Sequence, residues 1–193
     1  RVKNNLQVIS SLLSLQESHV KDEKISQLLR ESGNRLHAMA LIHEALYQSA
    51  DLKNVDLADF LPQLIEHVFE SYEVVQAKIA LSIEVEPLIF EADTVVNFGL
   101  IVNELVSNAF KHAFPGERRG RLQVIAQRQK QELVLTVSDD GVGIAAHVDI
   151  RKSRSMGMQV VHGLVRQLRG ALTSRRDGGT TIEMHFPLPK LSS

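Results

Sequence analysis

Four polar side chains between positions 104 and 112 have the types and spacing that phosphate chemistry uses. Glu104 and Asn108 are four residues apart, and Lys111 and His112 follow Asn108 by three and four residues. On a helix, this spacing places a carboxylate, an amide oxygen, an ammonium and an imidazole on one face. Mg²⁺ prefers oxygen ligands, a cation neutralises phosphate, and a carboxylate can position or deprotonate a nucleophile. The pattern favours a metal-bound polyphosphate site, and a merely solvated polar face is an equally weighted alternative.

A second signal is the motif Asp-x-Gly-x-Gly, which is formed by Asp139, Gly141 and Gly143 directly after a predicted strand. A carboxylate at a strand end can accept a hydrogen bond from an adenine amino group. The glycines let the backbone turn sharply beside a flat base. The motif alone is weak evidence, because ordinary turns use the same residues.

Two further glycine-containing segments follow along the chain. Gly157 and Met158 open a predicted helix, where free backbone N–H groups suit phosphate, and Gly179-Thr180 precedes the last predicted strand. The loop before this helix carries three basic residues that we expect to form a mobile lid, namely Arg151, Lys152 and Arg154. Each segment alone fits an ordinary turn, but the order and spacing of all four signals are hard to obtain by chance.

The first fifty residues predict only helices. Apolar residues recur every three or four positions between Val2 and Leu15, residues 17–22 interrupt the pattern as a turn, and a second stripe runs from Ile25 to Tyr47. Asp22 is the expected N-cap of the second helix. Two such helices expose more apolar surface than one partner covers, and pairing two hairpins in a four-helix bundle would bury it. We therefore expect a homodimer through these helices.

Beyond a polar joint at residues 51–54, the pattern mixes helices with strands. Helical periodicity covers residues 56–72, 93–114 and 158–168, and strands are predicted over 79–85, 121–127, 132–138, 171–175 and 181–186. This mixture predicts an α+β sandwich in which helices cover one face of a mostly antiparallel sheet. The chain is therefore predicted to consist of two domains, a dimerisation hairpin at residues 1–50 and the α+β sandwich at residues 51–193.

Composition excludes several classes of protein. The formal net charge of −1 is too balanced to favour nucleic acid or an anionic membrane as the main partner. The absence of cysteine excludes disulfides, a thiol nucleophile and cysteine-ligated zinc. No apolar stretch approaches the roughly 18 residues that a bilayer span requires. Because the sequence begins at Arg1 without an initiator Met, we expect a cytoplasmic fragment of a longer protein.

The ordered set of motifs resembles, over residues 55–189, the ATP-binding domain shared by sensor histidine kinases, gyrase-type topoisomerases, Hsp90-type chaperones and mismatch-repair ATPases. The resemblance implies that ATP and Mg²⁺ are bound. Asn108 matches the family's metal ligand, Asp139 its adenine-binding residue, and Glu104 the position of its acid or base. The residues assigned to ATP by this resemblance are Asn108, Lys111, His112, Asp139, Gly141, Gly143, Gly157, Met158 and Thr180.

The start of the chain narrows the family. Residues 1–7, Arg-Val-Lys-Asn-Asn-Leu-Gln, are similar to the phosphoacceptor segment His-Arg-x-Lys-Asn-x-Leu of a histidine-kinase group that is closely related to the HWE kinases. The chain contains no Trp, so the HWE-defining tryptophan is missing and the sister group fits better. The histidine that should precede Arg1 is not in the sequence, and we expect the polypeptide as printed to be unable to phosphorylate itself.

The resemblance implies the core of a two-component sensor histidine kinase. Such a core transfers the γ-phosphoryl of Mg·ATP to a histidine on the first helix and then to an aspartate of a response-regulator receiver domain. One alternative is a non-kinase ATPase or a serine-directed anti-sigma-type kinase on the same fold, although the hairpin that begins at Arg1 argues against it. The other alternative is an ATP-sensing scaffold without a phosphoacceptor.

Overall fold

A computed structural model describes residues 2–23, 54–70, 72, 78–144 and 155–188, together with positions 25, 26, 28–30, 32, 33, 35, 36, 39 and 40. The lid residues expected from the sequence, Arg151, Lys152 and Arg154, lie outside the described residues, as do Arg1 and the domain boundary at residues 50–51. None of the described helices combines the length and the apolar character that a membrane crossing requires.

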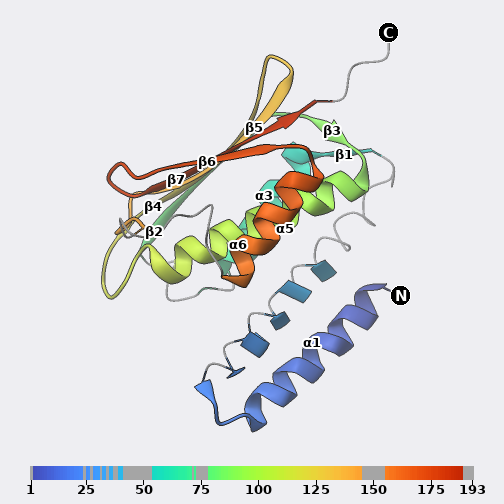
Figure 1. The fold of residues 1–193 in the computed structure, drawn as a ribbon, viewed down its shortest axis with the longest axis vertical. Helices are drawn as coiled ribbons and strands as arrows, with labels where there is room; N and C mark the ends of the chain where they lie inside the picture. Colours follow the sequence, from blue (N-terminus) through green and yellow to red (C-terminus); the bar gives the residue numbers. More distant parts are fainter. Residues whose placement is uncertain are drawn as a thin grey trace.

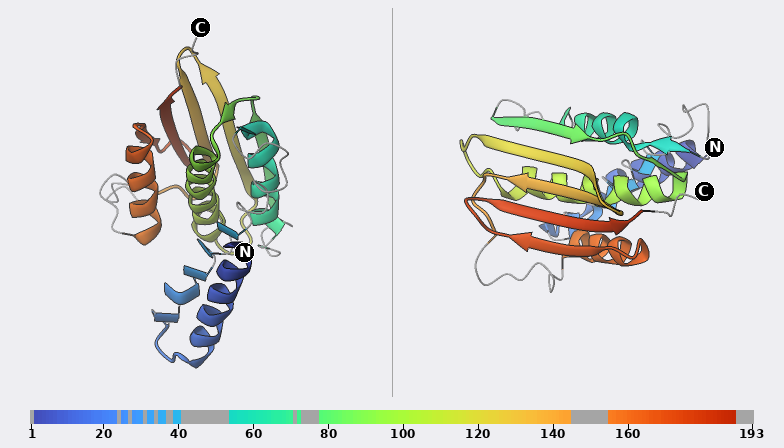
Figure 2. Two further views of the ribbon diagram at one scale, coloured as in Figure 1. Left: turned by 90° about the vertical axis from the view of Figure 1, so that its right-hand side faces the viewer. Right: turned by 90° about the horizontal axis from the view of Figure 1, so that it is seen from above.

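The N-terminal part is built from α1 (Val2–His19) and a second helical segment, in which every described residue from 23 to 40 is helical. The two run side by side (Figures 1 and 2). Asp22 Oδ1 accepts a hydrogen bond from the backbone N–H of Ile25 at 3.2 Å, which confirms Asp22 as the N-cap. Arg30 joins the segment to α1 through an ion pair with Glu17 at 2.7 Å.

Helix α1 ends later than the sequence predicted. The turn expected at residues 17–22 begins only after His19, because two polar side chains bond back to the preceding helical turn. Ser18 Oγ donates to the carbonyl oxygen of Leu15 at 2.7 Å, and His19 Nδ1 lies 2.8 Å from the same oxygen. Side chains that satisfy the last carbonyls of a helix extend it through residues of low apolar content.

The rest of the described chain forms an open sheet with helices. The strand order is β2-β4-β5-β7-β6, in which only the β2–β4 pair is parallel. The strands are β2 (Ile79–Val85), β4 (Gly120–Gln129), β5 (Glu132–Asp139), β6 (Ala171–Arg175) and β7 (Thr180–Pro187). A separate antiparallel pair is made by β1 (Val55–Asp56) and β3 (Ile89–Phe90).

Helices α3 (Leu57–Glu70), α5 (Ala92–His112) and α6 (Met156–Gln167) cover one face of this sheet (Figures 1 and 2). Alternate residues of β4, β5 and β7 point into the layer between sheet and helices, where Leu122, Leu135 and Met184 are fully buried. Phe98 of α5 packs edge-on against Phe186 of β7, with 5.0 Å between ring centroids. The predicted α+β sandwich, with helices on one face, is confirmed.

Candidate active site

A cavity of about 350 Å³ lies between α5, the end of β5, the start of α6 and the start of β7. Nine of the ten site residues predicted from the sequence line it, and Gly141 lies behind its wall. The nine are Glu104, Asn108, Lys111, His112, Asp139, Gly143, Gly157, Met158 and Thr180. Segments far apart in the sequence therefore meet at one site.

The polar residues of helix α5 that line the cavity differ in how exposed they are, and the helix does not present them as one solvated face. Glu104 is buried, whereas Asn108 is half-buried and Lys111 is exposed. Leu105 and Ala109, the apolar residues that follow Glu104 and Asn108, also line the cavity. The reason is that α5 lies between α3 and α6 (Figure 2), so that more than its sheet-facing side is covered. The wall of the cavity is consequently apolar as well as polar.

Asp139 is held at the end of β5 by backbone donors. Its Oδ1 accepts hydrogen bonds from the N–H of Gly141 at 2.9 Å and from the N–H of Thr180 at 3.3 Å. Burial raises the pKa of the Asp139 carboxyl above its usual value, and the two N–H donors partly oppose that rise. The carboxylate thus joins the Asp-x-Gly-x-Gly turn to the first residue of β7.

The glycines around Asp139 are required by close backbone packing. A Cβ atom on Gly141 would collide with the backbone of Ala113, and one on Gly179 would collide with the carbonyl group of Asp139. Gly143 has a φ of +71°, which L-residues with side chains rarely adopt. The turn is also tied to the end of α5, because the N–H of Val142 donates to the carbonyl of Ala113 at 2.9 Å.

Two residues that sequence reasoning missed fix this turn from outside. Arg118 Nη2 donates to the carbonyl oxygens of Asp140 and Gly141 at 2.8 and 3.1 Å. The Asp140 carboxylate accepts from the N–H of Arg121 at 2.6 Å. No local pattern marks Arg118, because its partners are backbone carbonyls more than twenty residues away.

The start of α6 brings a helix N-terminus to the opposite side of the cavity. Ser155 caps it, with Oγ accepting from the N–H of Met158 at 3.4 Å. A Cβ atom on Gly157 would stand 2.5 Å from Oε2 of Glu104, so a larger residue at this position would displace the Glu104 carboxylate. Met158 completes the contact, because its sulfur lies 4.0 Å from Nδ2 of Asn108.

An ion pair that the sequence did not predict joins the two parts of the molecule at this cavity. Arg35, from the second helical segment, donates from Nε to Oε1 of Glu104 at 2.5 Å and from Nη2 to Oε2 at 3.2 Å. The two side chains are only 17% and 9% exposed. The partners are 69 residues apart, and no periodicity in either segment indicates the other.

The described residues could hold Mg²⁺ only together with a bound polyphosphate that supplies further oxygen ligands. Among them, no group of three or more His, Asp or Glu side chains converges as a metal site. The amide nitrogen of Asn108 faces the sulfur of Met158. The amide oxygen of Asn108 is therefore the atom that could bind a metal. Mg²⁺ commonly takes one or two protein oxygens and completes its shell with phosphate and water. One amide oxygen on the wall of the cavity matches that mode.

Comparison with protein families decides between the possible classes. Residues 1–72 match a model described as histidine kinase. Residues 94–190, half of the chain, match a model described as histidine kinase-, DNA gyrase B- and HSP90-like ATPase. This chain belongs to the histidine kinases. Its second part is accordingly an ATP-binding domain, as the order of the motifs indicated.

Two histidine kinases are similar to this chain over nearly its whole length. The sensor histidine kinase PdtaS of Mycobacterium tuberculosis strain H37Rv is 32% identical over 192 residues, which cover 97% of this chain and 38% of the relative. The blue-light-activated histidine kinase 2 of Erythrobacter litoralis is 26% identical over 192 residues, which cover 97% of this chain and 55% of the relative. The chain therefore spans less than half of the mycobacterial protein.

Solved structures show the same fold. The histidine kinase domain of the Erythrobacter litoralis EL346 blue-light-activated histidine kinase superposes with a TM-score of 0.75 at 22% identity, over 96% of this chain and 94% of that one. The Acinetobacter baumannii histidine kinase AdeS gives a TM-score of 0.59 at 19% identity, over 96% and 98% of the two chains. This histidine kinase core thus shares the architecture of helices followed by an ATPase domain.

Proposed function

We propose that this chain transfers the γ-phosphoryl of Mg·ATP to a histidine placed just before Arg1 on the first helix, and from there to an aspartate of a response-regulator receiver domain. The observation that supports this most is the cavity itself. It gathers Glu104, Asn108 and Asp139 on the ATP-binding domain, and Arg35 reaches it from the N-terminal helices. A site that both parts of the molecule line is suited to moving a phosphoryl group between them.

In this proposal, different residues of the cavity bind the adenine, the phosphates and the metal ion. Asp139, at the end of β5, accepts a hydrogen bond from the adenine amino group, and the cavity-lining residues Gly143 and Thr180 border the base. Lys111 and His112 approach the phosphates from the exposed side of α5. When bound through Asn108, Mg²⁺ supplies neutralising charge to the phosphate oxygens.

The chemical step in this proposal is an in-line displacement. A neutral imidazole nitrogen forms a bond to the γ-phosphorus, while the bond between that phosphorus and the bridging oxygen of ADP breaks. The proton on the other imidazole nitrogen passes to Glu104, which is the carboxylate placed for it. The regulator aspartate then forms a bond to phosphorus as the imidazole leaves. The protein contributes mainly positioning and charge neutralisation.

A homodimer through the N-terminal helices is part of this proposal. Val8, Leu12 and Leu15 on α1 are 60%, 55% and 59% exposed, and Ile25 and Leu28 on the second segment are nearly half exposed. Exposed apolar stripes of this extent usually mark an interface. Sedimentation equilibrium of the 193-residue polypeptide should give twice the monomer mass, and a monomer at micromolar concentration would contradict the inference.

Base recognition by Asp139 predicts a loss of specificity on substitution. In Asp139→Ala the affinities for ATP and GTP should converge, because the acceptor for the adenine amino group is gone. Removing one partner of a buried polar group costs about 1–3 kcal/mol, which corresponds to a loss of roughly 5- to 150-fold in ATP affinity. Titration of each nucleotide against wild type and variant measures this. A wild-type chain that binds GTP as well as ATP would show that Asp139 does not read the base.

Asp139→Asn separates recognition from folding. It keeps one oxygen for the N–H groups of Gly141 and Thr180 but replaces the other with an N–H₂ donor, which faces the adenine amino group unfavourably. Because burial raises the pKa of the native carboxyl, ionisation at pH 7 opposes folding, and the neutral amide should melt no lower than wild type. A lowered melting temperature with unchanged ATP preference would contradict the assignment.

A further inference from the structure

Arg35 pairs with Glu104, which is the first residue of α5 that lines the cavity. The Asp-x-Gly-x-Gly turn is tied to Ala113, at the C-terminal end of α5. Glu104 stands nine residues earlier, which at about 1.5 Å per residue is roughly 13 Å back along the helix. A nucleoside triphosphate whose base lies at Asp139 and which extends along α5 therefore brings its terminal phosphate toward Glu104 and Arg35.

The negative charges of Glu104 and a bound polyphosphate at this end of the cavity require a cation to balance them. Glu104 is a buried carboxylate, and a polyphosphate beside it would be repelled without compensation. Lys111 and His112 stand seven and eight residues farther along α5, roughly 10–12 Å from Glu104, so the phosphates that they approach lie nearer the middle of the nucleotide than its terminal phosphate. Among the described residues that line the cavity, Arg35 is the only arginine, and it stands at the Glu104 end.

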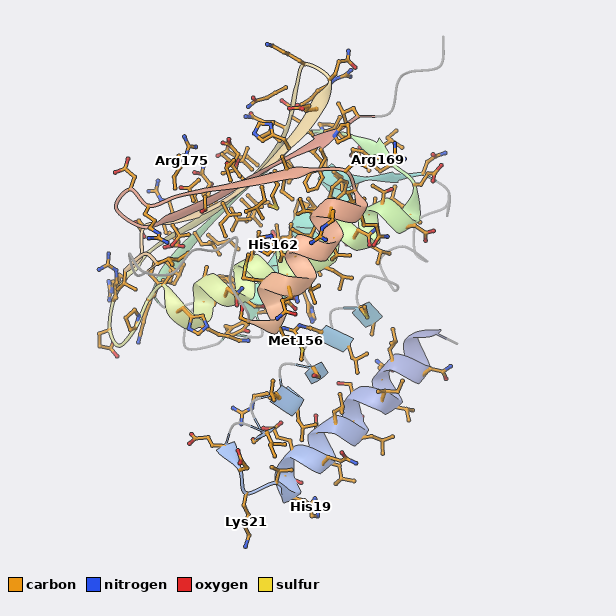
Figure 3. The ribbon with its side chains drawn as sticks, viewed as in Figure 1. His19, Lys21, Met156, His162, Arg169 and Arg175 are labelled. Atoms are coloured by element: carbon orange, nitrogen blue, oxygen red, sulfur yellow. The ribbon has the colours of Figure 1, made fainter. Side chains whose placement is uncertain are left out.

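The guanidinium of Arg35 has capacity for a second anion. Glu104 engages Nε and Nη2, and within the described part of the chain Nη1 has no hydrogen-bond partner. An arginine has five N–H donors in a planar fork, so one edge can hold a carboxylate while the other faces a phosphate. Gly157, at the N-terminus of α6, adjoins both side chains, with its Cβ position 3.3 Å from Nη2. Met156 marks the beginning of α6, on the side of the N-terminal helices (Figure 3).

From this arrangement we propose that Arg35 binds the terminal phosphate of ATP through the edge of its guanidinium that Glu104 does not occupy. The inference rests on the proposed function, because it takes ATP as the occupant of the cavity. It makes Arg35 a residue of the nucleotide site that the N-terminal helices supply. ATP, which carries the terminal phosphate, then favours docking of those helices on the ATP-binding domain, whereas ADP does not.

The test compares ATP and ADP affinities of the 193-residue polypeptide in Mg²⁺. Arg35→Gln should lower the affinity for ATP by about tenfold or more, because a charge-assisted contact is lost. The affinity for ADP should change by no more than about twofold. The ATP affinity of Arg35→Lys should lie between those of wild type and Arg35→Gln, since lysine keeps the charge but lacks the planar fork of N–H donors. Arg30→Gln is the matched control, because Arg30 lies in the same segment and pairs with Glu17 away from the cavity.

A double variant separates phosphate contact from simple neutralisation of Glu104. If Arg35 contacts the phosphate, the chain that carries both Arg35→Gln and Glu104→Gln should still bind ATP more weakly than wild type. Recovery of wild-type ATP affinity in the double variant would overturn the inference, as would an Arg35→Gln chain in which ATP and ADP are equally affected or equally unaffected. Either outcome leaves ATP binding itself intact. A wild-type chain that binds no ATP would instead overturn the proposed function together with this inference.

Discussion

Asn108→Ala should lower the Mg²⁺-dependent affinity for ATP by about a hundredfold or more while leaving the fold intact. Loss of a group that merely orients a metal ligand typically costs 10- to 100-fold in metal affinity, and loss of the ligand itself should cost at least as much. The fold should survive, because the one hydrogen bond of the half-buried Asn108 side chain to another described residue is a weak one, at 4.0 Å, to the sulfur of Met158.

Titration with ATP in Mg²⁺ and again in EDTA measures this effect. Wild type should bind ATP more tightly with the metal than without it, and Asn108→Ala should bind equally weakly in both. Ser107→Ala is the matched control, because Ser107 is the preceding residue on α5 and does not line the cavity. An Asn108→Ala chain with unchanged, metal-dependent affinity would refute Asn108 as a metal ligand.

The sheet and its helices were predictable because period-two and period-3.6 patterns report directly which residues face a core. The strand predicted over residues 79–85 matches β2 at both ends, and the predicted hairpin over 121–138 is β4 and β5. Leu122 and Val124 alternate along the first strand of this hairpin, and both are fully buried, as is Leu135 of the second strand. Periodicity identifies the face of an element, and here the faces agreed with the elements that form.

Periodicity does not identify what lies against that face. The sequence placed Glu104 on a polar helix face, but in the structure Arg35 and the start of α6 lie against its side chain and bury it. Arg35 and Arg118 were missed for a related reason. Their partners are distant in sequence, and an arginine on a polar helix face or in a loop looks the same whether it is solvated or paired.

The second large effect concerns the phosphoacceptor. The 193-residue polypeptide should bind ATP and fail to label itself from γ-labelled ATP. Extension by one helical turn that ends in His would continue α1 and place an imidazole next to Arg1, Lys3 and Asn4 in sequence, whose polar groups can steady a phosphate. A neutral imidazole is a competent nucleophile near neutral pH. The extended chain should therefore become labelled, and replacement of the new His by Gln should abolish the label.

Glu104→Gln in the extended chain tests the role of the carboxylate. It should keep ATP affinity near that of the parent and slow the labelling, because an amide cannot accept the proton that the imidazole gives up. The rate of label incorporation at saturating ATP measures this. Loss of ATP affinity equal to that in Asn108→Ala would instead make Glu104 part of the metal site.

Labelling of the extended chain, with the chemical stability of the product, tests the central claim most directly. We predict a phosphoramidate that is labile in acid and stable in alkali, that forms only with the added His, and that a receiver domain can remove. An extended chain that binds ATP but incorporates no label would contradict the histidine kinase mechanism and favour an ATP-sensing scaffold. Label on the unextended chain would contradict the placement of the phosphoacceptor before Arg1.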